Sequence, residues 1–264
     1  MTKQLNKADL HIHSNYSDGT ASVEEILAHV AVSDLRLIAI TDHDRIAGAH
    51  KAKQLARSFG VEVIVGEEVS TAEGHLLALF IEQELAPGRP AAETIGAIHA
   101  QGGLCIAPHP FDRSVPSLGA AGLRERCAGP RRGDLPIDAI EGLNAGVLWS
   151  QRGSNHLAQR LAADRGLPAV GGSDAHSLAT IGQAYTLFPG SSADDMYRAI
   201  QRGQVRWGGG YWSAGQYLDM SLRWVRQRGL HGMLRLMLDG AGVTQREHRT
   251  VADEPLAAQL WSGR

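Results

Sequence analysis

The sequence predicts an α/β fold with a barrel-like sheet, because short apolar runs alternate with helically spaced segments over about the first 170 residues. Seven such units fit a closed or distorted barrel better than an open parallel sheet, although periodicity alone does not separate the two. The predicted strands are Ala8–Ile12, Leu37–Thr41, Val61–Val65, His75–Phe80, Leu104–Ala107, Ala139–Leu143 and Ala169–Gly171.

Helical spacing fills most of the intervals between these strands. Ser22 precedes Glu25 by three residues, which is the pattern of a capping box at a helix start. Gly60 and Gly166 stand where helices are expected to end. The predicted helices are Ser22–Ser33, Ile46–Phe59, Ala91–Gln101 and Ser154–Arg165.

The pattern weakens after about residue 185, so we expect two parts: a barrel at residues 7–204 and a mostly helical extension at 205–264 that packs on it. The glycines 208–210 are expected to interrupt the pattern. The weaker elements are a strand at Thr186–Phe188 and helices at Ala193–Arg202, Tyr217–Gln227 and Leu230–Leu238.

Composition excludes several classes of protein. Hydrophobic residues make up 43% of the 264, enough for a sizeable core. A net charge of -2 gives no overall basic field for nucleic acid. Cys105 and Cys127 do not make a disulfide framework. With no signal-peptide pattern and no apolar run of membrane-spanning length, we expect a cytoplasmic protein with no membrane contact and no obligate protein partner.

The segment DLHIHSNYSDG, residues 9–19, gathers four potential metal ligands at the end of the first predicted strand. Asp9, His11 and His13 alternate, so their side chains leave the strand on one face. Two imidazoles about 6–7 Å apart along a strand can converge on one metal ion. Asp18 follows in a turn that ends at Gly19. The alternative, a surface strand with incidental histidines, is disfavoured by this density of ligands.

Two further clusters also follow strands. In TDHD, residues 41–44, His43 lies between two aspartates, and a ligating imidazole commonly donates its other N–H to a carboxylate. The alternative is a turn in which Asp44 caps a helix. In GEEVS, residues 66–70, a glutamate can bridge two metal ions, and the pattern barely separates Glu68 from Glu67. His75 follows, and alone it would more often be structural.

The last two clusters add a rigid histidine and a second alternating pair. His109 lies between two prolines in IAPHPFDR, residues 106–113, and Arg113 is near enough to contact a phosphate. A solvated loop arginine is the alternative. In GGSDAH, residues 171–176, Asp174 and His176 alternate after a strand.

These clusters predict a site for two or three divalent metal ions. The donors are nitrogen and oxygen without any cysteine, which suits Zn, Mn or Fe. Such sites activate hydroxide and clamp the oxygens of a phosphoryl group. The nine candidate ligands are His11, His13, Asp18, His43, Glu68, His75, His109, Asp174 and His176. The other six histidines are interpreted as structural or surface residues: His29, His50, His99, His156, His231 and His248.

The ordered set DLHIHSNYSDG, TDHD, GEEVS, APHP and GGSDAH resembles the PHP (polymerase and histidinol phosphatase) family of metal-dependent phosphoesterases over about residues 7–190. The resemblance implies a distorted seven-stranded (β/α)7 barrel with a trinuclear site, and its pattern selects Glu68 over Glu67. It implies three ligand sets: His11, His13, Glu68 and Asp174 for the first ion; Glu68, His75 and His109 for the second; Asp18, His43 and His176 for the third.

Within that family the spacing is similar to nucleoside bisphosphate phosphatases and 5′-to-3′ exoribonucleases. Those relatives carry an insert between the histidines that match His75 and His109, where this chain has only 33 residues. This chain therefore lacks the cap that would shape selectivity for nucleotides. The resemblance implies a phosphoesterase for small phosphate monoesters, with nucleotides and 5′-phosphorylated RNA or DNA ends as further substrates. A metal-activated hydroxide would attack phosphorus, Arg113 would bind the phosphate and Asp44 would assist proton transfer.

Two other classes remain as alternatives. An amidohydrolase-type enzyme for C–N or C–O bonds would also use a His-x-His pair at the first strand, but no lysine is placed as a carboxylated bridge. A metal-stabilised binding module would close its site with four ligands and would not need nine.

Overall fold

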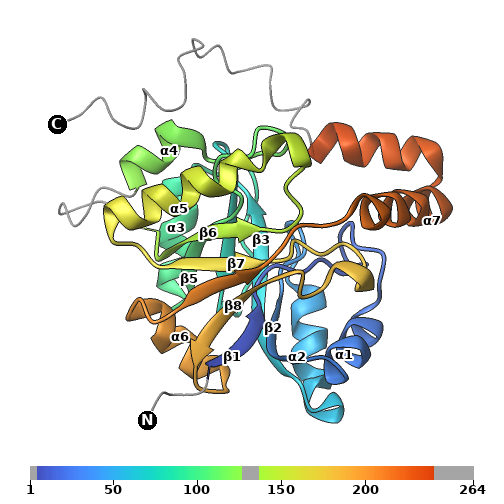
Figure 1. The fold of residues 1–264 in the computed structure, drawn as a ribbon, viewed down its shortest axis with the longest axis horizontal. Coiled ribbons are helices and arrows are strands. Elements are labelled where there is room, and N and C mark those ends of the chain that lie inside the picture. The colour runs from blue at the N-terminus through green and yellow to red at the C-terminus, as the bar shows by residue number, and fades with distance from the viewer. Residues whose placement is uncertain (1–4, 127–136, 241–264) are drawn as a thin grey trace.

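The structure, a computed structural model, describes residues 5–126 and 137–240. Within them, one nearly closed sheet has the strand order β7-β6-β5-β4-β3-β2-β1-β8-β9, so the predicted α/β barrel class is confirmed with additional strands (Figure 1). Cys127 and His248 lie outside the described residues. The strands are β1 (Leu5–Asp9), β2 (Leu35–Ile40), β3 (Glu62–Ser70), β4 (His75–Leu79), β5 (Leu104–Ala107), β6 (Ala139–Asn144), β7 (Ala169–Gly172), β8 (Ala184–Pro189) and β9 (Arg206–Gly209).

The sheet is mixed: the alternation over the first 170 residues favours parallel strands, and within that range this expectation is wrong for β4 alone. β1, β2 and β3 run parallel to one another, as do β5, β6 and β7. β4 is antiparallel to both of its neighbours, because residues 71–74 are too few for a crossover between parallel strands. β8 is antiparallel to β1, and β9 is antiparallel to β8.

β9 lies where the glycine run was expected to interrupt the pattern. Gly208 pairs with Tyr185 of β8, and a Cβ atom at Gly208 would lie 2.7 Å from the Tyr185 ring. The absence of a side chain therefore lets this edge strand approach β8 closely. The glycines therefore form part of a strand at this edge, where the Tyr185 ring packs over Gly208.

Hydrogen bonds beyond the regular strands close the barrel next to the candidate site. The backbone N–H of His13 donates to Ala175 O at 2.8 Å, and that of Ala175 donates to His11 O at 3.2 Å. On the other side of β7, the Thr186 hydroxyl donates to Gly171 O at 2.8 Å. The first and seventh strands are thereby joined where their ligands emerge.

The predicted helices are present, and most of their predicted ends lie within one or two residues of the observed ends. Ser22 and Glu25 form the expected capping box, and Gly60 and Gly166 end their helices at φ 67° and 65°. Gly229, at φ 71° and ψ 168°, separates the two helices predicted near the C-terminus. The helices are α1 (Val23–Ala31), α2 (Ala47–Phe59), α3 (Ala91–Ala100), α4 (Gly119–Arg126), α5 (Gly153–Arg165), α6 (Ala193–Gln201) and α7 (Ala214–Gly240).

Two apolar layers leave one end of the barrel for polar residues. Leu37 and Ala39 of β2 belong to the inner layer with Met196 and Ile200 of α6, which packs against the strands there. The outer layer packs the sheet against α1, α2, α3 and α5, which Figure 1 shows as two groups on different sides. No helix in the described ranges is both long and apolar enough to cross a membrane.

Asp9, at the end of β1, connects three parts of the barrel. Its carboxylate is fully buried and accepts backbone N–H groups from His11 at 3.3 Å, Ser173 at 3.0 Å and Gly182 at 2.8 Å. It is therefore engaged by the backbone rather than by the cluster of candidate ligands.

We expect Asp9→Ala to lower the free energy of unfolding of the metal-free chain by about 3 kcal/mol, since three buried donors would lose a charged acceptor. Urea denaturation measures this change. The control is Asp34→Ala, which removes an exposed partner of Lys7 and should cost less than about 0.5 kcal/mol. Equal losses for the two variants would contradict the role given to Asp9.

Candidate metal centre

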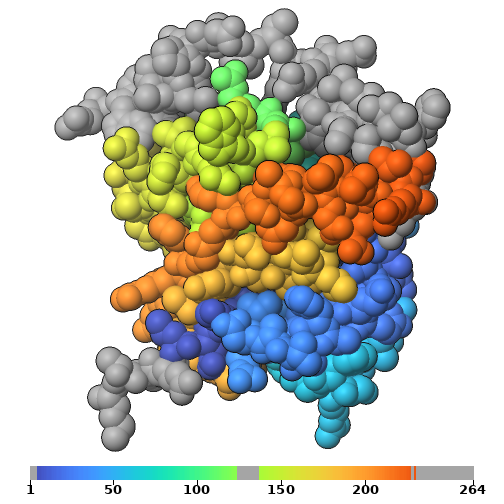
Figure 2. All heavy atoms as spheres, turned by 45° about the vertical axis from the view of Figure 1, so that its right-hand side comes forward, coloured from blue at the N-terminus to red at the C-terminus, as the bar shows by residue number. Residues whose placement is uncertain are grey.

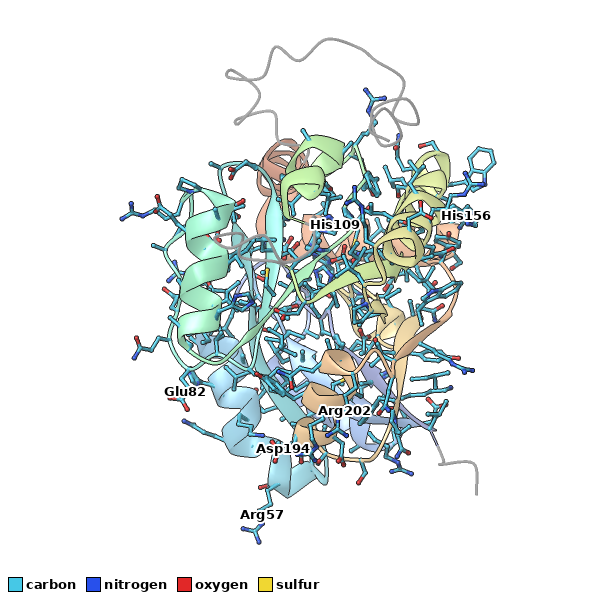
Figure 3. The ribbon with its side chains drawn as sticks, turned by 90° about the vertical axis from the view of Figure 1, so that its left-hand side faces the viewer. Arg57, Glu82, His109, His156, Asp194 and Arg202 are labelled. Carbon is cyan, nitrogen blue, oxygen red and sulfur yellow. The ribbon has the colours of Figure 1, made fainter. Side chains whose placement is uncertain are left out.

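The nine candidate ligands come together at one end of the barrel, although they come from six different strands or the residues after them. Glu68 lies within β3, each of the others follows or begins a strand of the sheet, and the closure between His11, His13 and Ala175 brings the first and last groups together. Figure 3 shows His109 within the body of the molecule and His156 at its edge. The fold therefore turns ligands that are distant in sequence into one cluster.

Glu68 is the centre of this cluster. Its Oε1 lies 2.9 Å from His75 Nδ1 and 3.0 Å from His109 Nε2. Its Oε2 lies 3.2 Å from the Nε2 atoms of both His11 and His13. The two oxygens of one carboxylate thus face two different pairs of imidazoles, which is the geometry of a ligand that bridges two ions.

One group of potential ligand atoms combines His11, His13, Glu68 and Asp174, all within 4.8 Å of one another. Asp174 Oδ1 lies 3.4 Å from His11 Nε2 and 3.2 Å from His13 Nε2. Neither ring nitrogen of the buried His13 has a well-formed hydrogen bond with a described residue. Unsatisfied buried nitrogens amid carboxylates fit a divalent cation, which accepts this mixed donor set.

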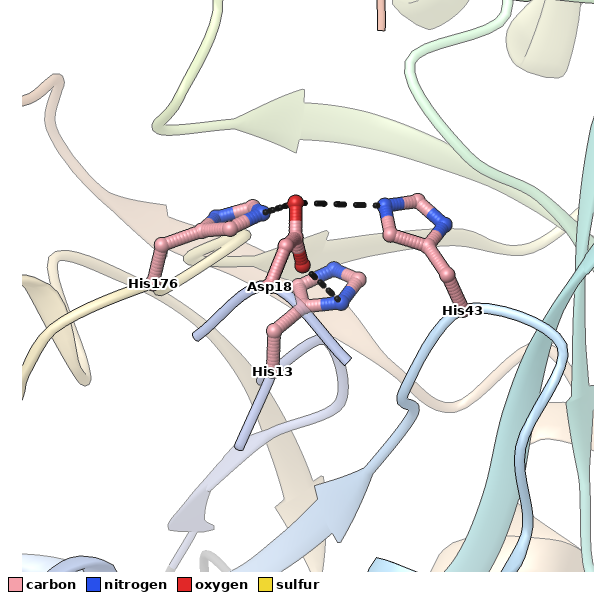
Figure 4. A group of neighbouring side chains, drawn as sticks. All are labelled: His13, Asp18, His43 and His176. Carbon is pink, nitrogen blue, oxygen red and sulfur yellow. Dashed lines mark hydrogen bonds and ion pairs between the residues drawn. The ribbon is translucent and has the colours of Figure 1, made fainter. Parts of the chain in front are cut away.

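A second group joins His13 to Asp18, His43 and His176 (Figure 4). Asp18 Oδ2 lies 3.1 Å from His176 Nε2 and 3.8 Å from His43 Nε2, while its Oδ1 lies 3.6 Å from His13 Nδ1. A third group consists of His43, Glu68 and His75. His13, His43 and Glu68 each belong to two groups, so the groups form one continuous centre.

Exposure increases from one side of the centre to the other. The His11 and His13 side chains are fully buried and His109 is 3% exposed, whereas Asp174 is 17% and His43 is 29% exposed. The cluster is therefore most accessible to solvent on the side of His43.

Backbone strain concentrates at the centre. Asp44, His109 and Asp174 have positive φ angles of 49°, 29° and 53°, and Phe80 is the one other non-glycine residue in the described ranges with a positive φ. Such conformations cost about 1–3 kcal/mol each and persist where the surroundings enforce them. The location agrees with a functional role for these loops.

Hydrogen bonds on the far side of three imidazoles orient the rings. His11 Nδ1 donates to Glu141 Oε1 at 3.1 Å, His109 Nδ1 to Ser117 Oγ at 3.2 Å, and His176 Nδ1 to Asp174 O at 2.8 Å. Each ring then directs the lone pair of Nε2 toward the cluster, as a metal ligand requires.

Glu141 is a functional residue that the sequence interpretation missed. Its buried carboxylate also accepts the backbone N–H of His109 at 2.7 Å and the Asn144 amide at 2.8 Å. It thereby positions ligands from two strands. The available signal was a glutamate inside the apolar run Ala139–Leu143, near the end that carries ligands in the neighbouring strands.

The charges of the centre perturb its pKa values strongly. Burial alone would raise the pKa of Glu68, but His43, His75 and His11 hold it well below the usual value. Burial likewise opposes the charge of His13, yet Asp174, Glu68 and Asp18 raise its pKa to about 10. The site is therefore a set of carboxylates that holds positive charge, whether as protons or as metal ions.

The remaining candidates lie at the edge of this geometry. Asp44 Oδ1 accepts the Ser70 N–H at 2.7 Å, and Arg113 is exposed. Asp42 accepts bonds from Ser14 and Ser17, so it fixes the turn before Asp18 rather than His43. Of the histidines interpreted as structural, His99 lies 2.9 Å from Asp138 Oδ2, on the helix-covered side of β5.

Comparison with known proteins identifies the family. A family model described as PHP domain matches residues 9–109, and one described as PHP-associated matches residues 152–205. An uncharacterized protein of Methanocaldococcus jannaschii is 37% identical over 150 residues, which are 53% of this chain and 82% of that protein. The chain belongs to the PHP domain family. The family predicted from the sequence is confirmed.

Other similarities are shorter or structural. A 5′-3′ exoribonuclease of Haemophilus influenzae is 42% identical over 71 residues, which span 27% of this chain and only 25% of that enzyme. A two-domain protein of Bacteroides vulgatus, which contains a predicted PHP-like metal-dependent phosphoesterase, superposes with a TM-score of 0.66 at 18% identity. The match covers 79% of this chain and 66% of that one. At this identity the superposition establishes the fold.

We expect Glu68→Gln to reduce retained divalent metal strongly, since an amide loses the charge that serves two groups of imidazoles. The matched control is Glu67→Gln on the next residue. Glu67 faces Leu85 N–H at 3.0 Å, and burial raises its pKa to about 8, so little charge is lost at neutral pH. Elemental analysis after dialysis measures the metal, and equal metal content in both variants would contradict the assignment.

Proposed function

We propose that this chain hydrolyses small phosphate monoesters with two or three divalent ions held by the nine candidate ligands. The reaction class follows from the family: the chain is a metal-dependent phosphoesterase. The observation that carries the proposal is the buried Glu68 carboxylate, whose oxygens face His75 and His109 on one side and His11 and His13 on the other.

Two of the proposed ligand sets follow groups described above, and the other follows the contacts of Glu68 with His75 and His109. His11, His13, Glu68 and Asp174 would hold the first ion, and Glu68 would share the second with His75 and His109. A third ion would bind Asp18, His43 and His176, with His13 beside them. Imidazole and carboxylate donors suit Mn, Zn or Fe.

When bound, such ions supply hydroxide at neutral pH and neutralise charge on a phosphoryl group. The chain contributes rigidity, because Glu141 and Ser117 fix the rings of His11 and His109 before any substrate arrives. Arg113, on the segment after β5, is proposed to contact the phosphate. Asp44, held by the Ser70 N–H beside His43, is proposed to assist proton transfer to the leaving oxygen.

The substrate class is inferred from the surroundings of the centre. Between His75 and His109 the chain forms β4, the segment 80–90, α3 and β5, without a separate capping domain. Small phosphorylated molecules can therefore reach the ligands from the side of His43. The similarity to an exoribonuclease supports nucleotides and 5′-phosphorylated ends as substrates within this class.

Hydrolysis of C–N or C–O bonds is not favoured. Enzymes of that kind often bridge their ions through a carboxylated lysine. The three lysines in the described ranges lie elsewhere. Lys7 pairs with Asp34, Lys51 pairs with Glu24, and Lys53 donates to the Val63 carbonyl. Glu68 supplies the bridging carboxylate in their place.

Metal removal tests the proposal directly. Exhaustive chelation should abolish hydrolysis of an aryl phosphate, and Mn²⁺ or Zn²⁺ should restore it. Asp174→Ala should lower kcat/KM at least about 100-fold because it opens the first ligand set. His99→Ala, in which the lost imidazole pairs with Asp138 away from the centre, should stay within about twofold of wild type. Full activity of the demetallated protein would refute the proposal.

Substrate selectivity provides a second test. Discrimination needs contacts away from the reacting phosphate, and no capping domain separates His75 from His109 to provide them. We expect kcat/KM values for a nucleoside bisphosphate, a sugar phosphate, an aryl phosphate and a 5′-phosphorylated dinucleotide to lie within about two orders of magnitude. A preference of about a thousandfold, roughly 4 kcal/mol, would contradict the open site.

A further inference from the structure

The segment after β9 reaches the metal centre from outside the part of the chain that the family models match. Those matches end at residue 205, whereas Trp212 and the helix α7 follow it. Figure 2 shows this segment as an orange band across the surface, next to the gold residues around 175–190. Trp212, Met220 and Trp224 are buried there in an apolar cluster with Leu143 and Ala145.

Two indole N–H groups hold the loops that carry ligands. Trp224 Nε1 donates to the carbonyl of Asp18 itself at 2.6 Å. Trp212 Nε1 donates to the carbonyl of Ser173, directly before Asp174, at 3.0 Å. A buried indole N–H needs a hydrogen-bond acceptor, and here both acceptors are backbone carbonyls on turns that carry candidate ligands.

Both indole rings also confine the imidazole of His176. Their centroids lie 6.1 Å from that ring for Trp212 and 5.7 Å for Trp224, at interplanar angles of 73° and 90°. These are edge-to-face contacts, which restrict the tilt of the imidazole. The Nδ1 bond to Asp174 O fixes its rotation, so Nε2 stays directed at Asp18.

The segment is itself anchored to the barrel at several points. Trp212 N–H donates to Ala145 O at 3.0 Å, and the Tyr217 hydroxyl donates to Gly146 O at 2.9 Å. The Gln216 amide donates to Ala179 O. The indoles are therefore fixed relative to β6 and β7 and act as rigid supports.

We propose that Trp212 and Trp224 are positioning residues that set the affinity of one metal position, the group of His13, Asp18, His43 and His176. This inference rests on the proposed metal-dependent function. The group of His11, His13, Glu68 and Asp174 has additional supports in Glu141 and Asn144, which lie outside the C-terminal segment, so the loss of Trp224 should leave this group in place. The C-terminal helix thus completes the exposed half of the centre.

The test is equilibrium dialysis of the full chain against buffered Mn²⁺, with stepwise affinities from elemental analysis. Trp224→Ala should weaken one equivalent about 10- to 100-fold and leave the others unchanged. Trp224→Phe, which keeps a ring but loses the N–H donor, should weaken the same equivalent less. Trp149→Ala is the control, since that side chain belongs to a residue 81% exposed. Circular dichroism confirms folding, and Trp224→Phe serves if Trp224→Ala does not fold.

A double-mutant cycle identifies the position. Asp18→Asn should remove the same equivalent, and adding Trp224→Ala to it should cause no further loss. Equal weakening of every equivalent, or no change in any, would overturn this inference alone. A wild-type chain that retains no divalent metal would overturn the proposed function together with it.

Discussion

The burial of the Glu68 carboxylate is the constraint on which the rest of the centre depends. An ionised carboxylate taken out of water costs several kcal/mol unless positive charge compensates it. Five imidazoles approach its two oxygens, and no single element could supply them. They come from β1 and β2 on one side of β3 and from β4 and β5 on the other, and the bonds between His13 and Ala175 add the ligands that follow β7.

Much of this arrangement could be predicted from the sequence, because apolar runs locate strands and the residues after parallel strands share one end of a sheet. The shared orientation of His11 and His13, and that of Asp174 and His176, could be predicted from the alternation of side chains along a strand. The strand pattern alone gives no direction for β4. Its direction follows from the short connection after β3, which became clear only because β3 continues past its predicted end at Val65 to Ser70. β9 was missed because its glycines form a strand only under the Tyr185 ring.

The supporting residues were harder to predict than the ligands. Glu141 does not lie in any of the histidine clusters of the sequence. Its role follows from hydrogen bonds to His11 and His109, which are 130 and 32 positions away along the chain. Trp212 and Trp224 lie in the segment 205–264, for which the sequence predicted only a mostly helical extension that packs on the barrel. Their N–H bonds to Ser173 and Asp18 arise from tertiary contacts that local sequence does not encode.

The two halves of the centre are therefore assembled by different means. His11 and His109 are buried, and Glu141 in the neighbouring strand fixes both, so this half is as rigid as the sheet. His43 and His176 are more exposed, and His176 lies against aromatic rings from the C-terminal segment. A substrate that approaches by His43 meets this outer half first. Sequence changes in the C-terminal segment can thus alter the surroundings of the substrate while the buried ligands keep their geometry.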